Sequence, residues 1–284
     1  MFDIKSIPDY SEFKYWFKRV RNSDGRDAIA VSSVETGDFI RFLELQEESE
    51  DASLAEDVDI VADYKKFMLC PEYYVGLPVD LEGSQEYKIA TYERILVGSR
   101  LLNEPISRKN KVAEIYGSRM LEWLRSTDMY VAPGSTVFHD SYEGGLLDHS
   151  LRVYNLANEL MRAPKFTLAN LGSVAMAALV HDWCKIGLYA KYRKNVKNED
   201  TGKWEQQDAF KYDQKGAPLG HGVTSMFLAG KFFNLSVEEA AAIRWHMGAY
   251  RTVEAEFSEM QMANETYPLV HLIQFADQLS LAKF

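Results

Sequence analysis

One stretch of sequence constrains the fold more than any other: an apolar segment over residues 168–185 that ends in a histidine, an aspartate and a lysine. The segment is rich in alanine and leucine and is apolar on most sides, which predicts a helix at the centre of a helical domain. His181 and Asp182 close this helix, and Lys185 follows on the same helical face. A carboxylate at the end of a buried helix needs a cation or another partner, and divalent metals accept both imidazole and carboxylate. By itself, a His-Asp dipeptide is equally compatible with a structural role, so a metal site requires further ligands elsewhere in the chain.

The sequence around this segment predicts that the central helix belongs to a bundle, because apolar residues recur at close to a 3.6-residue period in the C-terminal part of the chain. We expect helices over residues 109–126, 146–161, 221–233, 236–247 and 267–283. Ser236 and Glu239 have the spacing of a capping box at the start of one of them. Residues 188–218 interrupt the series. Their aromatic residues lie on either side of a turn at 198–202, which predicts two ribbon-like arms.

The N-terminal third has a different pattern, which predicts an α+β region. We expect a helix over residues 9–21, strands at 28–33 and 39–45 around a turn at 35–38, a strand at 64–69 and a helix at 87–102. This region has no nucleotide-binding glycine pattern, and its sequence assigns it no chemistry. A scaffold or interaction role is the expectation.

The charge distribution limits the classes of partner. The chain has a net charge of −10, and its acidity is concentrated in residues 1–107, above all in a run from Glu44 to Asp63 that contains no lysine or arginine. Such a run is typical of a solvated face and argues against coating of a nucleic acid. The partners compatible with it are another protein or a second copy of the chain. Cys70 and Cys184 predict no disulfide framework, and neither a signal peptide nor a membrane span is recognised. We therefore expect a cytoplasmic protein.

Further metal ligands are available at the predicted helix ends. His149 lies near the start of one helix, His221 lies between two glycines, and His246 ends another helix. Asp277 lies within an apolar helical stretch, where a carboxylate needs a positive partner. Ligands that project inward from facing helices are how a helical bundle builds a two-metal site. The candidate ligands are His149, His181, Asp182, His221, His246 and Asp277.

These residues resemble the H…HD…D signature of the HD-domain metal-dependent phosphohydrolases. The Gly-Gly-Leu-Leu-Asp-His block that ends at His149, the upstream His139 and the blocks around His221 and His246 are similar to a subgroup of HD-type 3′–5′ exoribonucleases and phosphodiesterases. The resemblance covers about residues 109–283. Two segments depart from those exoribonucleases: residues 1–107 do not match their nucleic-acid-binding OB domain, and residues 188–218 look like the insert of HD hydrolases from bacteria and their phages.

The resemblance implies a ligand set and a reaction. One metal would be held by His149, His181, Asp182 and Asp277, and Asp182 would bridge to a second metal held by His221 and His246. Nitrogen and oxygen ligands without thiolate suit Mn, Fe, Co, Ni or Mg. Two such ions can share a hydroxide that attacks phosphorus while both ions clamp the phosphate. Lys185 would neutralise a phosphate oxygen or orient Asp182. The alternative for Lys185 is a cation that only compensates the helix dipole.

Four more residues are candidates for contact with substrate. His139 is either a substrate-facing or supporting residue of the site or an ordinary loop histidine. Arg152, one turn after His149, is either a phosphate ligand or a surface charge. Lys191 and Arg193 alternate with aromatic residues in the 188–218 insert, and such ribbons can stack a base and bind phosphate. They are also common on exposed hairpins.

The sequence therefore predicts a mostly α protein, with an α+β region over residues 1–107 and an HD-type helical bundle over residues 108–284. The expected activity is metal-dependent hydrolysis of a phosphoester or phosphodiester in a mono-, di- or cyclic nucleotide. Two alternatives stay open: a 3′–5′ exoribonuclease, and a non-catalytic HD module that senses nucleotides or binds a partner. A di-iron oxygenase on a similar scaffold is a further alternative.

Overall fold

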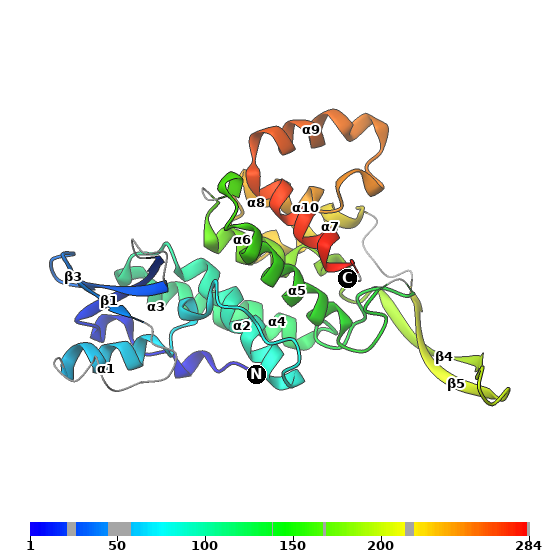
Figure 1. The fold of residues 1–284 in the computed structure, drawn as a ribbon, viewed down its shortest axis with the longest axis horizontal. Coiled ribbons are helices and arrows are strands. Elements are labelled where there is room, and N and C mark those ends of the chain that lie inside the picture. Colours follow the sequence, from blue (N-terminus) through cyan, green and yellow to red (C-terminus); the bar gives the residue numbers. More distant parts are fainter. Residues whose placement is uncertain (22–26, 45–57, 138, 167–168, 214–218, 283–284) are drawn as a thin grey trace.

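The computed structural model describes residues 1–21, 27–44, 58–137, 139–166, 169–213 and 219–282 (Figure 1). It is mostly helical with a small antiparallel sheet in its N-terminal part, so the predicted fold class is confirmed. Most of the acidic run between Glu44 and Asp63, and the end of the last predicted helix, lie outside the described residues. Within the described residues, no helix is long and apolar enough to cross a membrane.

The N-terminal sheet has three antiparallel strands in the order β1-β2-β3. Their bounds are Tyr15–Arg21 for β1, Asp27–Ser33 for β2 and Phe39–Glu44 for β3. The predicted strands at 28–33 and 39–45 are thereby confirmed, except for residue 45, which lies outside the described residues. Gly37 lies in the predicted turn between them with a φ of 76°, in the left-handed region where glycine carries no steric penalty.

The predicted helix over residues 9–21 is wrong. The chain forms a short 3₁₀ turn at Tyr10–Glu12 and then β1, which pairs with β2 over seven residues. The aromatic residues at 13, 16 and 17 have the spacing of a helical face. The pairing with β2 favours the strand, because the backbone N–H and C=O groups of both strands then form hydrogen bonds with each other.

The predicted strand over residues 64–69 is also wrong. These residues form the end of helix α1 (Val58–Phe67) and the turn that follows it. The rings of Tyr64 and Phe67 both contact Phe17 of β1, with centroid distances of 5.4 and 5.3 Å. Residues three apart reach the same neighbour on a helix but not on a strand.

In the described residues from 58 onward, the regular elements are helices and one hairpin. The α-helices are α2 (Gln85–Leu101), α3 (Ile106–Ile115), α4 (Leu121–Ser126), α5 (Gly145–Leu160), α6 (Leu171–Val180), α7 (His221–Gly230), α8 (Val237–Trp245), α9 (Phe257–Thr266) and α10 (Pro268–Ser280), with a π-helical segment at Tyr116–Met120 between α3 and α4. Further 3₁₀ turns lie at Ile4–Ser6, Pro71–Tyr74, Pro164–Phe166, Trp183–Lys185, Gly248–Arg251 and Glu254–Glu256. All the helices predicted from residue 87 onward are present, and α9 is an additional one.

Helix α6 lies at the centre of the helical body, as the apolar segment predicts. Eight of its ten residues are buried, and it packs against α2, α5, α7, α8 and α10. Helices α5 and α8 both pack against α10, and α7 packs against α8. The C-terminal end of α6 therefore lies among the ends of four other helices.

The hairpin of β4 (Tyr189–Lys197) and β5 (Trp204–Tyr212) projects away from the helical body (Figure 1). It confirms the two arms predicted for the 188–218 insert. The strands pair in register from Tyr189 with Tyr212 at the root to Lys197 with Trp204 near the tip. Nearly all side chains between these ends are exposed or half-buried. The hairpin therefore has no core of its own, and only its root approaches the body.

Candidate metal centre

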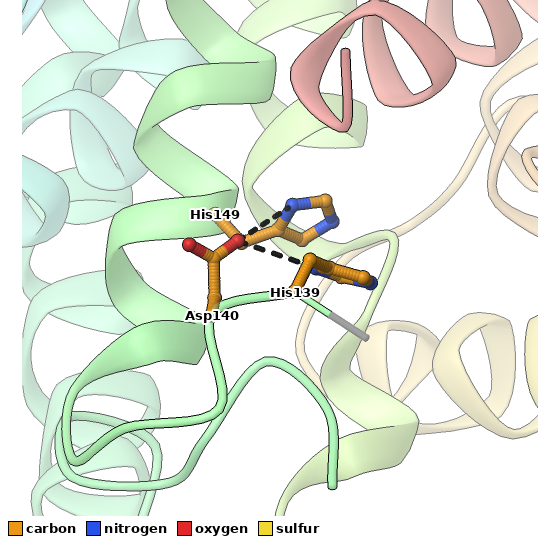
Figure 2. A group of neighbouring side chains, drawn as sticks. All are labelled: His139, Asp140 and His149. Atoms are coloured by element: carbon orange, nitrogen blue, oxygen red, sulfur yellow. Dashed lines mark hydrogen bonds and ion pairs between the residues drawn. The ribbon is translucent and has the colours of Figure 1, made fainter. Parts of the chain in front are cut away.

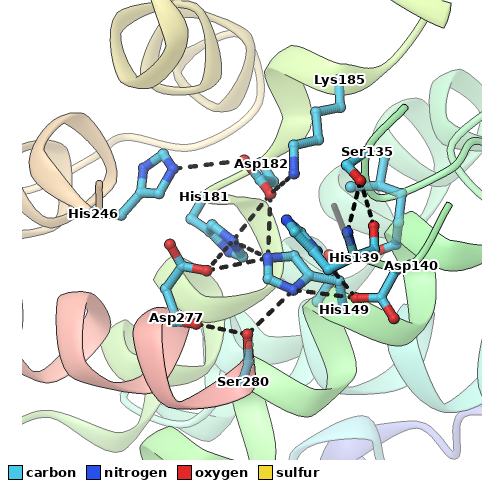
Figure 3. Close-up of polar contacts among 12 residues, drawn as sticks. Ser135, His139, Asp140, His149, His181, Asp182, Lys185, His246, Asp277 and Ser280 are labelled. Atoms are coloured by element: carbon cyan, nitrogen blue, oxygen red, sulfur yellow. Dashed lines mark hydrogen bonds and ion pairs between the residues drawn. The ribbon is translucent and has the colours of Figure 1, made fainter. Parts of the chain in front are cut away.

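Five helix ends bring the six candidate ligands together, and Figure 3 labels all of them except His221. His149 lies in α5, which begins after Gly144 with a φ of 88°. His181 and Asp182 follow the last residue of α6. The remaining ligands are the first residue of α7, the residue after α8 and a residue in the last turn of α10: His221, His246 and Asp277.

Four of the ligand atoms form a compact group. The Nε2 atom of His149 lies 3.1 Å from Nε2 of His181, 3.3 Å from Oδ2 of Asp182 and 3.2 Å from Oδ1 of Asp277. Nε2 of His181 lies 3.4 Å from Oδ2 of Asp182. All four side chains are at least nine-tenths buried. These separations are those expected for neighbouring ligands of one ion with metal–ligand bonds of about 2.0–2.2 Å.

In His149 and His181, the Nε2 atom that faces the other ring carries a lone pair, because of the hydrogen bonds at Nδ1. Nδ1 of His181 donates to the carbonyl oxygen of Ala178 at 2.8 Å. Nδ1 of His149 lies 3.3 Å from Oγ of Ser280, whose hydroxyl already donates to the Asp277 carbonyl. Nδ1 therefore carries the hydrogen in both rings, and both Nε2 atoms are available as ligands. A cation between them satisfies both lone pairs and both carboxylates.

A second group lies on the other side of Asp182. Its Oδ1 atom is 2.8 Å from Nε2 of His221 and 3.5 Å from Nε2 of His246. Nδ1 of His246 donates to the carbonyl oxygen of Ile243 at 2.8 Å, so its Nε2 carries the lone pair. This buried nitrogen has no hydrogen-bond partner in the described structure. A buried polar atom without a partner is costly, and a second ion would provide the missing partner.

The two oxygens of Asp182 therefore face two different ligand groups, which is the geometry of a bridging carboxylate. Both groups consist of imidazole nitrogens and carboxylate oxygens. The triads His149–His181–Asp182 and Asp182–His221–His246 are each close enough to hold a metal ion, and Asp277 forms a further triad with His181 and His246. The residues fit two divalent ions with nitrogen and oxygen ligands.

Lys185 adds a positive charge to this centre. Its Nζ atom lies 2.6 Å from Oδ2 of Asp182, and the side chain is buried. Burial would raise the pKa of Asp182, but Lys185 and His181 hold this pKa well below its usual range. Burial also opposes the charge of Lys185, yet Asp182 raises the lysine's pKa above its ordinary value. Both groups are therefore charged at neutral pH.

His139 lies beside the first ligand group, in the loop before α5 (Figure 2). Its ring centroid is 5.1 Å from that of His149, and its Nδ1 is 3.3 Å from Oδ2 of Asp140. Its backbone N–H donates to Oγ of Ser135 at 2.9 Å. Arg152 does not reach into the ligand groups. It forms two hydrogen bonds to Asp140, of 3.0 and 3.2 Å.

A cavity of about 800 Å³ opens over the ligands. Its lining includes His139, His149, Asp182, Lys185, His221 and Asp277. Lys191 and Arg193 are not part of this lining. Lys191 forms ion pairs with Glu143 and Asp208, and Arg193 lies 3.7 Å from Asp208. Contact of these two cations and of Arg152 with substrate therefore stays a prediction.

Sequence reasoning did not single out several residues of the site, and four of them matter for its geometry. Asp140 and Ser280 support His149 from behind, and Tyr189 and Tyr212 line the cavity. For Asp140, the sequence signal was its position next to the candidate His139, which is weak evidence for a role in the site. The two tyrosines stand at opposite ends of the insert, and only the hairpin register shows that they meet.

Comparison with known families agrees with this geometry. The family model described as "HD domain" matches residues 146–282, a range that contains all six candidate ligands. Residues 146–282 thus match the HD domain and contain a buried cluster of histidines and aspartates. No curated protein and no solved structure matches the chain significantly.

Proposed function

We propose that this protein is a metal-dependent phosphohydrolase that cleaves a phosphoester or phosphodiester bond of a nucleotide. The observation that carries the proposal is the position of Asp182, whose two oxygens face separate nitrogen ligands at the floor of a large cavity. A shared carboxylate of this kind suits the paired ions that catalyse phosphate ester hydrolysis. The HD domain over residues 146–282 supports the same class of reaction.

Each side chain has a defined task in this proposal. His149, His181, Asp182 and Asp277 would hold one ion, and Asp182, His221 and His246 would hold the other. When bound, two divalent ions would activate water and neutralise the charge of the phosphate. Lys185 lies on the cavity wall beside Asp182 and keeps its positive charge there. It would stabilise negative charge that develops on a non-bridging phosphate oxygen.

The size and charge of the cavity favour a small nucleotide over a long strand. About 800 Å³ is far more than a phosphate alone needs and is within the range of sites for small organic ligands. The two basic residues of the hairpin that were candidates for substrate contact, Lys191 and Arg193, are partly neutralised by Glu143 and Asp208. A continuous strand would need several unpaired cations along its path.

The test is a hydrolysis assay with the purified protein and Mn²⁺. The substrates are 5′- and 3′-mononucleotides, cyclic nucleotides, dinucleotides and a single-stranded RNA oligonucleotide. We expect turnover of at least one small nucleotide, and loss of turnover in Asp182→Asn with the fold intact by circular dichroism. Stepwise shortening of the RNA without turnover of small nucleotides would instead indicate an exoribonuclease. Bound metal without any turnover would contradict the enzyme and favour a nucleotide sensor.

A further inference from the structure

The cavity over the metal ligands has an aromatic wall. Tyr189 and Tyr212 both line the cavity, and their ring centroids lie 5.3 Å apart with an angle of 52° between the ring planes. The rings contact each other, so they form a tilted wall and leave no slot between them. Leu188 lies next to them in the same lining.

The hairpin register is what places the two rings together. Tyr189 is the first residue of β4, Tyr212 is the last residue of β5, and the two are direct cross-strand partners. Direct partners present their side chains on the same face of the hairpin. Because β4 begins only a few residues after Lys185, the root of the hairpin lies against the metal centre.

The other aromatic residues of the hairpin do not line the cavity. Phe210 is two residues from Tyr212 and shares its face of the hairpin, but it is not part of the lining. Tyr192 is an odd number of residues from Tyr189, so its side chain points to the opposite face, and it is not part of the cavity lining. Trp204 is eight residues from Tyr212, about 27 Å along the strand at ~3.4 Å per residue. Among the aromatic residues of the hairpin, Tyr189 and Tyr212 are therefore the two that line the cavity above Asp182 and Lys185.

We propose that Tyr189 and Tyr212 form the base-binding wall of the site and select nucleoside phosphates over phosphates without an aromatic base. This inference rests on the proposed function for the position of the phosphate. The cavity holds a polar cluster at one place and aromatic rings at another, which matches the two ends of a nucleotide. Stacking on aromatic rings is tolerant of base identity, because every base has a π face. We therefore expect all four common bases to bind with similar affinity.

The decisive variant is Tyr212→Ala, because the Tyr212 side chain is 55% exposed and its loss does not open the core. The measurement is equilibrium binding of adenosine 5′-monophosphate and of ribose 5-phosphate to the Mn²⁺-loaded protein by calorimetry. If either compound is turned over, its KM takes the place of the dissociation constant. Tyr212→Ala should weaken binding of the nucleotide by roughly 5- to 150-fold, the equivalent of ~1–3 kcal/mol for one stacked base. The ratio of the affinity for adenosine 5′-monophosphate to the affinity for ribose 5-phosphate should fall by the same factor.

Two control variants separate stacking from other effects. Tyr212→Phe keeps the ring and should retain the preference for the nucleotide. Tyr192→Ala removes a tyrosine that is 39% exposed on the opposite face and should bind both compounds as the wild type does. The proposal is overturned if Tyr212→Ala changes both affinities equally or neither, if Tyr192→Ala has the same effect, or if the wild type does not prefer the nucleotide.

This outcome is independent of the hydrolysis assay. Binding that depends on Tyr212 in a protein without turnover would overturn the proposed function and leave the aromatic wall in place. Turnover of nucleotides and sugar phosphates with equal efficiency, unchanged in Tyr212→Ala, would overturn the aromatic wall and leave the hydrolase in place.

Discussion

His149 and His181 approach each other to 3.1 Å through two nitrogens that both carry lone pairs. The hydrogens of the two rings are on the other nitrogens, which bond to Ser280 and to the Ala178 carbonyl. Two carboxylates lie against the same pair of atoms. Burial disfavours a charge on His149, yet Asp182 and Asp277 raise its pKa above the ordinary value. A cation between the two rings would therefore bind both lone pairs and neutralise the charge of the two carboxylates.

Removal of metal should lower the stability of the protein. An ion at a hundred times its dissociation constant stabilises a folded protein by about 2.7 kcal/mol, which corresponds to several degrees in Tm for a chain of this size. We expect EDTA to lower Tm and Mn²⁺ to restore it, with saturation at two ions per chain. Scanning calorimetry and elemental analysis measure the two quantities. A Tm that is the same with and without bound metal would show that the cluster does not need the ion for its stability.

A glycine beside His221 controls the distance between the two helices of the second ligand group. A Cβ atom on Gly222 would overlap with the backbone carbonyl of Arg244, two residues before His246. Gly222→Ala should therefore push α7 away from α8 and separate His221 from His246. We expect the bound metal to fall from two ions to one, with the first group retained.

The matched control is Gly230→Ala at the end of the same helix, where a Cβ atom would meet nothing within 4 Å. This variant should bind two ions, and the higher helix propensity of alanine should if anything stabilise it. Equal metal content in Gly222→Ala and Gly230→Ala would refute the idea that close helix packing sets the second site.

Lys185 has two possible tasks, and one variant distinguishes them. Lys185→Met removes the charge 2.6 Å from Asp182 and keeps most of the side-chain volume. If the lysine stabilises charge on the phosphate, kcat should fall by roughly 10²–10³, as for the loss of one preorganised donor, and metal content should not change. If it only orients Asp182, metal affinity should fall together with activity. Lys111→Met, at an exposed position of α3, controls for the loss of one positive charge.

The backbone of Asp140 explains why Arg152 is paired with it. Asp140 has a φ of 48° and is the only non-glycine residue with a positive φ in the described part of the chain. This conformation is unfavourable for most L-residues, although aspartate and asparagine tolerate it better than others. The two hydrogen bonds from Arg152 hold the side chain in place.

Replacement of Asp140 should therefore depend on the backbone preference of the new residue. Asp140→Ala loses both hydrogen bonds and is strained, so we expect a loss of about 1–3 kcal/mol in the free energy of unfolding. Asp140→Asn should lose less, because asparagine adopts positive φ readily and still accepts a hydrogen bond. Urea denaturation measures both. The control is Asp208→Ala, which removes only exposed ion pairs of the hairpin and should change stability by less than about 0.5 kcal/mol. Equal losses in Asp140→Ala and Asp140→Asn would argue against the role of the backbone.

The positions of several candidate metal ligands were predictable because the local sequence marks the helix end on which each lies. His181 and Asp182 end an apolar run, His221 lies between glycines, and Ser236 and Glu239 form the predicted capping box that begins the helix before His246. Helix ends are decided by a few neighbouring residues, so these signals are strong. These candidate ligands lie at helix ends, so the local signals that locate a helix end also locate its ligand.

Other features depend on partners far away in the chain and were not predictable. The aromatic spacing of β1 fits a helix, and only the pairing with β2 selects the strand. Asp140 takes its conformation because Gly134 and Gly145 let its backbone approach closely. Tyr189 and Tyr212 meet through the register of a hairpin whose residues carry little hydrophobic pattern. In each case tertiary contacts outweigh the local preference.

Glu239 of α8 joins its own helix to α2 and α6, and its ionisation should make stability depend on pH. One of its oxygens accepts hydrogen bonds from Arg100 of α2 and Ser173 of α6, both at 2.8 Å, and the other accepts from the backbone N–H of Ser236 at 2.9 Å. Burial would raise the pKa of Glu239, but Arg100, Ser236 and Ser173 together lower it below its ordinary value of 4.5. A carboxyl whose pKa is lower in the folded state stabilises the fold above the unfolded pKa, and this contribution is lost as the pH falls through the folded pKa.

Glu239→Gln should therefore be destabilised by about 1.5–3 kcal/mol at pH 7, because hydrogen bonds to a charged group are lost. The difference from the wild type should persist down to about pH 4.5 and then shrink at more acidic pH, where the wild-type carboxylate also becomes neutral. Denaturant unfolding at pH 7, 5 and 3.5 measures this difference. Glu122→Gln, at an exposed position of α4, serves as the matched control and should follow the wild type at each pH. A difference for Glu239→Gln that stays constant across the three pH values would mean that shape, and not charge, accounts for the role of this residue.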